Sequence, residues 1–274
     1  MGDKEALTEK KTPPVVLTIA GFDPSSGAGV TADVRTAAAH GCYAVSCITA
    51  LTVQSTGGVR SVAAVDGELV TETLEELAAD LEIAAVRIGM LGSGEVAAAV
   101  ADFLESSGLQ HVVLDPVLRS SSGAELLDRR GVEVLRGRLV RLAEVVTPNV
   151  DEAAALTGMR VGDVAEMKAA AARLHELGAR AAVITGGHLA KVTDVLSLEG
   201  KSGRAVETLE GEKIESRSTH GTGCAFATAV ACNLARGREI RDAVVEAKRF
   251  VRQAIASAYP LGRGTGPLNL EKVG

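Results

Sequence analysis

A glycine-rich turn in the last quarter of the sequence has residue types suited to holding an anion. Residues 220–224 read His-Gly-Thr-Gly-Cys and open a helix of small residues that is expected to run to Arg236. Successive backbone N–H groups in such a turn form a concave nest, and the helix dipole adds positive potential. We therefore expect Gly221, Thr222 and Gly223 to hold phosphate, although no Gly-Lys-Ser/Thr follows as it would in a P-loop.

The cysteine at the start of this helix is the candidate catalytic group. The dipole and the neighbouring amides are expected to lower the pKa of Cys224 and to raise its thiolate fraction. A thiolate in this place could take the proton of a hydroxyl group that attacks a phosphoryl group. The alternative is a small buried cysteine that only packs, which is the expectation for Cys232 two turns further on.

Two acidic residues are candidate magnesium ligands. Asp115 ends a strand-like run, and Glu152 follows Asn149 by three residues in a helix that begins near Pro148. Both Asn149 and Glu152 would then lie on one face of that helix. Magnesium keeps several waters and needs only one or two carboxylates beside phosphates. The alternative is helix capping, with Asn149 as the cap and Glu152 favouring the dipole.

A second glycine-rich segment, residues 27–32, fits the G-x-G-x-x-A pattern of dinucleotide-binding turns. Its glycines come several residues after the preceding strand ends near Ala20, and no acidic residue occurs between Val34 and Val65. A ribose ligand would need such an acid about 20 residues further on. We therefore favour a mobile loop that closes over a small substrate, with a turn that has no ligand role as the alternative.

The elements that must position these residues alternate between strand-like and helix-like runs. This order, with continuous apolar strands, predicts an α/β fold with a mostly parallel sheet covered on both faces. The expected strands are 15–20, 59–65, 85–90, 111–114, 145–147 and 181–185, with a late antiparallel pair at 192–198 and 206–209. The expected helices are 31–40, 67–81, 94–106, 165–177, 223–236 and 240–258. Because ligands bind beyond the carboxyl ends of parallel strands, the strand ends should converge on one site.

Composition narrows the class of protein further. The 274 residues carry a formal net charge of −6, which offers no field for attracting nucleic acid. Aromatic residues make up only 2%, so the core must be built from small aliphatic side chains. The four cysteines form no Cys-x-x-Cys pair, which argues against a disulfide scaffold or a structural zinc site.

We read one domain, residues 15–274, after a polar tail at residues 1–14 that we expect to be disordered. The tail lacks the apolar core of a signal peptide, and no apolar run approaches the roughly 20 residues that span a membrane. The expected location is the cytoplasm, without a membrane partner.

Taken in order along the chain, these segments resemble the hydroxymethylpyrimidine and phosphomethylpyrimidine kinases of thiamine biosynthesis, a branch of the ribokinase superfamily. The resemblance runs from about Val15 to Pro267. The stretches that carry it are 18–29, 48–56, 88–91, 115–117, 147–149, 220–224 and 264–267. It implies a ribokinase-like α/β fold, and a homodimer that uses ATP and Mg²⁺ to phosphorylate 4-amino-5-hydroxymethyl-2-methylpyrimidine and then its monophosphate.

The resemblance also implies roles for individual residues. Gln54 would hydrogen-bond the pyrimidine, Gly21 and Asp33 would line its pocket, and Met90 would pack on the ring. A side-chain amide suits the first role because it can both donate and accept. Read without the family, Gln54 is a solvated loop residue, Met90 fills the core, and Asp33 is a first-turn helix acid.

Two positions depart from the family pattern. Thr185 stands where many members have a lysine that would touch the ATP phosphates, and threonine there also occurs in related pyridoxal kinases. Arg119 adds a cation near the strand ends, which we read as a surface residue rather than a replacement for that lysine. A pyridoxal kinase therefore stays as the alternative function, and a non-catalytic nucleotide-binding protein is the alternative from another class.

Overall fold

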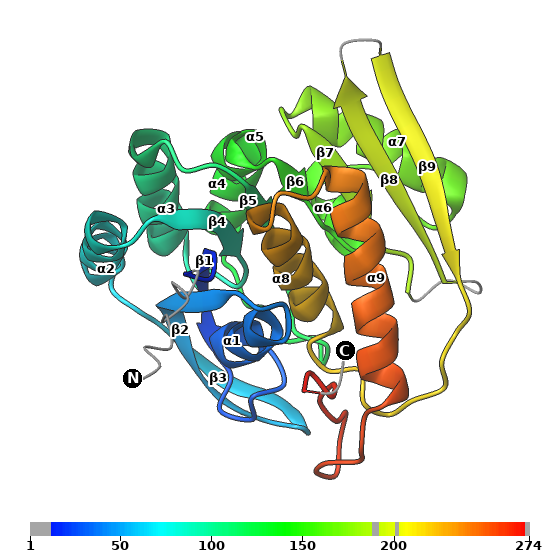
Figure 1. The fold of residues 1–274 in the computed structure, drawn as a ribbon, viewed down its shortest axis with the longest axis horizontal. Helices are drawn as coiled ribbons and strands as arrows, with labels where there is room; N and C mark the ends of the chain where they lie inside the picture. Colours follow the sequence, from blue (N-terminus) through cyan, green and yellow to red (C-terminus); the bar gives the residue numbers. More distant parts are fainter. Residues whose placement is uncertain (1–11, 188–191, 201–202, 272–274) are drawn as a thin grey trace, which may run out of the picture.

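A single mixed sheet forms the centre of the computed structural model, which describes residues 12–187, 192–200 and 203–271 (Figure 1). In these ranges the sheet has nine strands in the order β3-β2-β1-β4-β5-β6-β7-β8-β9. Strands β1, β2, β4, β5, β6 and β7 run parallel, whereas β3, β8 and β9 are antiparallel to their neighbours. The strands are β1 Val15–Phe22, β2 Tyr43–Ser55, β3 Gly58–Ala64, β4 Ile83–Ile88, β5 Val112–Leu114, β6 Val145–Val146, β7 Ala181–Ile184, β8 Val192–Gly200 and β9 Gly203–Gly211.

Helices cover both faces of the sheet. One face packs against α1 Gly29–Ala39, α8 Thr222–Ala235 and α9 Ile240–Ala256. The other packs against α2 Gly67–Asp80, α3 Gly94–Ser107, α6 Val150–Thr157, α7 Val164–Glu176 and the short run α4 Arg129–Val134, π-helical turn η1 Leu135–Leu139 and α5 Val140–Leu142. Among the residues described, no helix is both long enough and apolar enough to cross a membrane.

The alternation of side chains along the strands divides the core in two. On β1, Leu17 and Ile19 belong to the cluster under α2 and α3, whereas Val16 belongs to the cluster under α8 and α9. This period of two also turns Thr18 of β1 and Arg87 of β4 toward α1 and α8. Two polar side chains therefore enter an otherwise aliphatic layer, which requires partners for both.

The strand order places a switch point between β1 and β4. β1 continues through α1 to β2 on one side, and its other neighbour is β4, which leads on to β5. A crevice opens at such a point beyond the carboxyl ends of the strands, which is where ligands bind in open α/β sheets.

The predicted α/β fold is confirmed, and each of the expected strands and helices is present with its ends shifted by a few residues at most. The long strand β2 was not predicted. Its Ser, Cys, Thr and Gln residues dilute the apolar pattern, and its outer half is only partly buried where it pairs with β3. The run from α4 to α5 was also missed. Residues 1–11 of the expected tail lie outside the described residues.

Candidate active site

A cavity of about 170 Å³ lies beyond the carboxyl ends of the strands at the switch point. Its walls come from segments far apart in the sequence, including the ends of β1 and β4 and the first turn of α8. Of the residues predicted for the site, those on its walls are Gly21, Gln54, Met90, Asp115, Asn149, Glu152, Thr185, Gly221, Gly223 and Cys224. The expectation that the strand ends converge on one site is therefore confirmed.

Beside this cavity lies Arg87 on β4, a charged side chain that is fully buried. Its guanidinium donates to Asp33 Oδ2 at 3.0 Å and to Asp115 Oδ2 at 2.6 Å. Burial disfavours the charge of Arg87, but the Asp33 carboxylate, Cys224 and Asp115 more than offset that cost and raise its pKa. A single cation thus holds two buried carboxylates, one from α1 and one from the end of β5.

Asp33 lies beneath the cavity and not on its wall, so the predicted pocket-lining role is wrong. Its carboxylate is fully buried and accepts hydrogen bonds from Thr18 at 2.5 Å and from Thr228 of α8 at 2.7 Å, in addition to Arg87. The alternative is wrong as well, because Asp33 lies beyond the first turn of α1. Asp33 instead joins β1, β4, α1 and α8 behind the site.

Arg87 itself was missed by the sequence reading. The available signal was a charged residue inside the apolar strand 85–90, because an arginine is almost never fully buried unless it is paired.

The anion turn has the predicted geometry. Gly221 has a left-handed backbone (φ 81°) and precedes α8 as its N-cap. In the part of the chain that the structure describes, the amides of Gly223 and Cys224 donate to no protein acceptor and so stay available at the helix start. Thr222 is the exception among the predicted residues. It does not line the cavity, and its hydroxyl donates to the Thr219 carbonyl at 2.6 Å.

The glycine-rich loop before α1 packs directly on this turn. A Cβ atom at Gly221 would lie 1.8 Å from the Gly27 carbonyl oxygen, and one at Gly27 would lie 2.2 Å from the His220 ring. Glycine is therefore required at Gly221, where its backbone meets the Gly27 backbone, while the His220 ring occupies the space beside Gly27. Ala28 and Gly29 line the cavity, so the loop does border the site, and its closure over a substrate stays a prediction.

Cys224 is half-buried on the cavity wall, next to Arg87 and Asp115. The pKa of Cys224 is raised to about 12, mainly by burial and also by the Asp115 and Asp33 carboxylates, although Arg87 and the Gly29 amide act to lower it. The expected lowering of this pKa is therefore wrong in the ligand-free protein. The main reason is burial of the thiol, and the two carboxylates held by Arg87 add to it; the sequence showed neither.

Asn149 and Glu152 form a capping box at the start of α6. The Glu152 amide donates to Asn149 Oδ1 at 2.9 Å, and the Asn149 amide donates to Glu152 Oε2 at 3.0 Å. The capping alternative is thus confirmed, and both residues also line the cavity. Burial, with the nearby Asp115 carboxylate second, raises the pKa of Glu152 to about 8.

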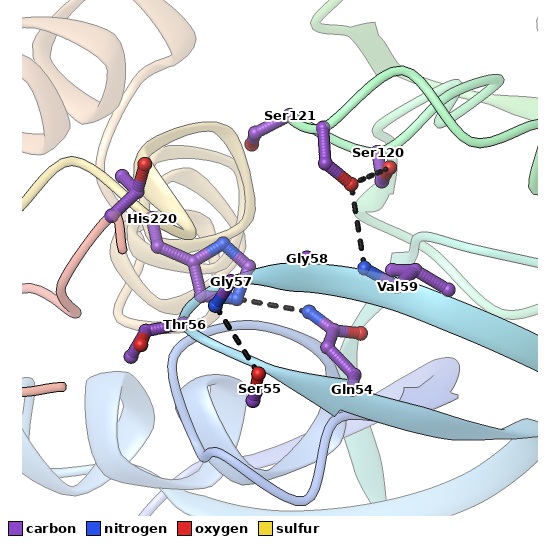
Figure 2. Close-up of a pocket in the computed structure, with 11 residues that line it drawn as sticks. Gln54, Ser55, Thr56, Gly57, Gly58, Val59, Ser120, Ser121 and His220 are labelled. Carbon is purple, nitrogen blue, oxygen red and sulfur yellow. Dashed lines mark hydrogen bonds between the residues drawn. The ribbon is translucent and has the colours of Figure 1, made fainter. Parts of the chain in front are cut away.

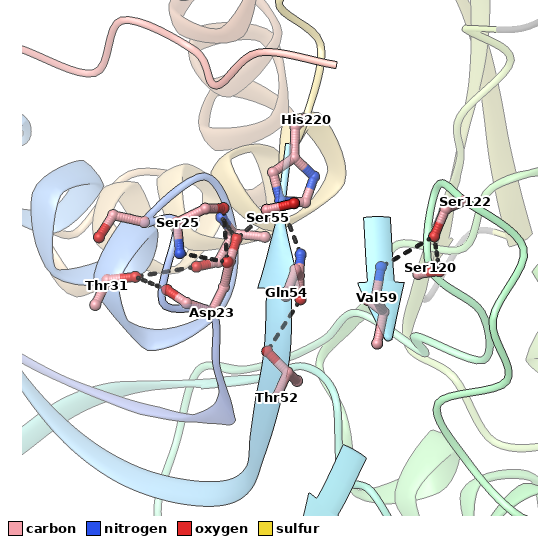
Figure 3. A network of polar contacts seen from close by, with 12 residues as sticks. Asp23, Ser25, Thr31, Thr52, Gln54, Ser55, Val59, Ser120, Ser122 and His220 are labelled. Atoms are coloured by element: carbon pink, nitrogen blue, oxygen red, sulfur yellow. Dashed lines mark hydrogen bonds and ion pairs between the residues drawn. The ribbon is translucent and has the colours of Figure 1, made fainter. Parts of the chain in front are cut away.

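A polar chain links the substrate side of the cavity to both glycine-rich segments (Figure 3). His220 Nε2 lies 2.8 Å from Asp23 Oδ2 and 3.1 Å from the side-chain amide of Gln54. Thr52 contacts the other end of that amide at 3.1 Å. Asp23 and His220 were not assigned by the sequence reading, and only the fold brings them together.

Below the Gln54 amide, Met90 packs close to Gly21, where a Cβ atom would lie 2.8 Å from the methionine sulfur. Met90 lines the cavity and also packs with Ala50 and Leu126. It therefore fills the core and also forms part of the cavity wall, and its packing on a substrate ring stays a prediction.

A smaller side chamber of about 70 Å³ opens beside Gln54 and His220 (Figure 2). The turn between β2 and β3 forms one wall, and the serine loop 120–122 forms the opposite wall. Ser122 bridges the two, because its hydroxyl accepts from the Val59 amide at 3.3 Å. The chamber adjoins the main cavity, because Gln54 and His220 line both.

Next to Thr185, which lines the cavity, Gly186 is held by a buried carboxylate. Asp194 accepts from the Gly186 amide at 3.0 Å and pairs with Lys248 at 2.6 Å. Lys248 is therefore paired with Asp194 behind the loop that follows Thr185. Arg119 does line the cavity, although its side chain is mostly exposed and pairs with Glu125 at 3.4 Å, so it is more than the plain surface residue expected. His188, three residues after Thr185, lies outside the described residues.

Fold and site together define an α/β kinase in which an anion turn at a helix start faces a small-molecule cavity. The sequence profile of the family described as phosphomethylpyrimidine kinase matches residues 23–269. The chain belongs to this family.

Known proteins support this assignment along the chain. The hydroxymethylpyrimidine/phosphomethylpyrimidine kinase of Streptomyces coelicolor is 42% identical over 265 residues, which cover 96% of this chain and 97% of the relative. The thiamine biosynthesis bifunctional protein ThiED of Geobacter sulfurreducens is 44% identical over 254 residues, which cover 93% of this chain but only 51% of that longer protein. The structure of the Bacillus subtilis pyridoxal kinase in complex with ADP matches with a TM-score of 0.85 and 33% identity, covering 94% of this chain and 97% of that one.

Removal of the Arg87 charge should destabilise the protein severely. In Arg87→Met two buried carboxylates lose their cation, and we expect a loss of about 3–5 kcal/mol in the free energy of unfolding, measured by urea denaturation. Arg138→Met is the matched control, because Arg138 also bonds two carboxylates, Asp102 and Glu105, but at the surface. Equal losses in the two variants would contradict the role of Arg87.

Replacement of Glu152 should change how stability depends on pH. Its pKa is about 8 in the native protein and near 4.3 in an unfolded chain, so the native state binds the extra proton between these values. Stability of the wild type should therefore fall as pH rises from about 5 to 8, because deprotonation favours the unfolded state. Glu152→Gln keeps an acceptor for the capping box and removes this dependence.

The measurement is the melting temperature without metal, taken for both proteins across this pH range. We expect the melting temperature of Glu152→Gln to rise steadily relative to that of the wild type from pH 5 to pH 8. Glu68→Gln, at an exposed first-turn position of α2, is the control and should show no such trend. A difference in melting temperature between Glu152→Gln and the wild type that stays constant with pH would contradict the raised pKa of Glu152.

Proposed function

We propose that this kinase transfers phosphate from ATP to 4-amino-5-hydroxymethyl-2-methylpyrimidine, and then to the monophosphate, in thiamine diphosphate biosynthesis. The observation that carries the proposal is that one cavity is lined both by Gly221, Gly223 and Cys224 of the anion turn and by Gln54. The turn suits a phosphoryl group, and the amide suits an aminopyrimidine edge. The substrate hydroxymethyl group would lie between them.

In the proposed reaction, the amides of Gly223 and Cys224 hold the oxygens of the transferring phosphoryl group. Their free N–H groups point to where negative charge accumulates, and the α8 dipole adds to this. Cys224 accepts the proton of the attacking hydroxyl. Because its pKa is high in the free protein, its thiolate is scarce near neutral pH, and positioning by the turn supplies most of the rate. Asn149 and Thr185 line the nucleotide side.

Magnesium would bind at Asp115 and Glu152, whose side chains both line the cavity. In the described ranges no three His, Cys, Asp or Glu side chains gather as a complete metal site. Two carboxylates fit magnesium, which takes its other ligands from phosphates and water. Burial raises the pKa of both carboxyls, so a divalent cation would also stabilise their ionised forms. When bound, the ion would neutralise charge on the ATP phosphates.

A pyridoxal kinase is the second candidate, and Thr185 together with the similarity to the Bacillus subtilis enzyme favours it. Gln54 and the relatives named as pyrimidine kinases favour the first. We further propose a cytoplasmic homodimer. Leu51 and Val53, about half exposed on one face of β2, offer an apolar strip for a second copy. A monomer mass by light scattering would contradict the dimer.

The two candidate functions are separated by one assay. ADP release is measured side by side with the hydroxymethyl pyrimidine, its monophosphate and pyridoxal, at saturating ATP and magnesium. We expect kcat/KM for the first two substrates to exceed that for pyridoxal by at least roughly tenfold, because Gln54 matches the aminopyrimidine edge. Equal values for the pyrimidine and pyridoxal would overturn the proposed specificity, and no release with any of the three would overturn the kinase proposal.

Loss of the thiol should slow turnover without unfolding the protein. We expect Cys224→Ala to lower kcat by roughly 10²-fold, since proton transfer contributes about that much. The wild-type rate should rise with pH because the thiolate fraction grows toward a pKa of about 12, and the variant should lose that rise. Cys232→Ala, two turns along the same helix and fully buried, is the matched control. Unchanged turnover in Cys224→Ala would remove the thiol from the mechanism.

A further inference from the structure

The hydrogen on His220 can be assigned from its partner Asp23. The Asp23 carboxylate accepts from the Ser25 amide at 2.8 Å, the Ser25 hydroxyl at 2.7 Å and the Ala28 amide at 3.0 Å. Although burial acts to raise it, the hydrogen bonds from His220 and Ser25 lower the pKa of Asp23. An ionised carboxylate can only accept, so the ring nitrogen 2.8 Å away, His220 Nε2, must carry a hydrogen and donate.

This assignment conflicts with the amide nitrogen of Gln54 facing the same atom. Gln54 Nε2 lies 3.1 Å from His220 Nε2, and two N–H donors cannot bond to each other. The other end of the amide has a matching conflict. The single hydroxyl hydrogen of Thr52 is used by the Phe22 carbonyl at 3.0 Å, and Gln54 Oε1, 3.1 Å away, would need the same hydrogen.

A half-turn of the Gln54 amide removes both conflicts, because it exchanges the oxygen and the nitrogen without moving the rest of the side chain. Gln54 Oε1 then accepts from His220 Nε2–H, which it shares with Asp23 Oδ2, and Gln54 Nε2 donates to Thr52, whose own hydrogen stays on Phe22. Figure 3 shows this chain of contacts running from Asp23 through His220 and Gln54 to Thr52. Every donor then faces an acceptor.

We propose that His220 is a specificity-determining positioning residue, which fixes the Gln54 amide with its oxygen toward the ring and its nitrogen toward Thr52. In this orientation one N–H and one oxygen lone pair remain for a ligand. They complement an edge with an amino group beside an unprotonated ring nitrogen, as in a 4-aminopyrimidine. A 4-oxopyrimidine carries a carbonyl beside a ring N–H, the reversed pattern, and would need the opposite amide orientation.

This inference rests on the proposed function and is tested by a ratio. The kcat/KM for the 4-amino substrate is divided by that for its 4-oxo analogue, 5-hydroxymethyl-2-methylpyrimidin-4-one, in each protein. His220→Leu frees the amide to turn, so we expect the ratio to fall by roughly tenfold or more. His220→Gln restores an N–H donor at a similar reach and should recover most of the preference. A purely structural role would lower both rates and leave the ratio unchanged.

Two more variants keep the test independent of folding at residue 220. Thr52→Val removes the acceptor at the other end of the amide with little change in shape and should also lower the ratio. His40→Leu, at the far end of α1, is the control and should keep the wild-type ratio. If the wild type phosphorylates the 4-amino substrate selectively and the ratio falls in neither His220→Leu nor Thr52→Val, this inference alone is overturned. A wild type inactive on that substrate overturns the proposed function itself.

Discussion

The guanidinium of Arg87 between two buried carboxylates is the interaction on which the site depends. It is made by a residue of β4 with one from α1 and one from the end of β5, so it joins three segments at the switch point of the sheet. Thr18 and Thr228 complete the partners of Asp33. Such a cluster is costly to bury unless its charges are paired and hydrogen-bonded. Its geometry therefore specifies how α1 and α8 sit on the sheet, and with them both glycine-rich segments.

The same cluster sets the electrostatics of the cavity. Asp115 and Glu152 carry carboxyl groups whose pKa values are raised by burial, and Cys224 shares their environment. The free protein can therefore bind a cation beside these acids and an anion at the amides of the anion turn. A metal–nucleotide complex brings both at once, which explains why a site so costly in charge burial can be retained.

Backbone and side-chain contacts together join the two glycine-rich segments. A Cβ atom at Gly221 would meet the Gly27 carbonyl oxygen, and one at Gly27 would meet the His220 ring. The loop before α1 was expected to serve a ligand by closing over it. Its glycines also serve the protein directly, because they let the anion turn and the Asp23–His220 pair come together beside Gln54.

The sequence by itself determined the layered α/β fold, the anion turn, the approach of the strand ends and the presence of Asp115 and Glu152 beside the site, because these follow from periodicity, helix starts and local turn chemistry. It could not place Asp33, whose spacing in α1 is equally compatible with a cavity wall and with burial. The pKa of Cys224 and the pairing of Asp23 with His220 were decided by tertiary structure alone. These properties depend on groups that lie 100 or more residues apart in the chain and face one another only in the folded protein. Local sequence does not show which of these groups meet.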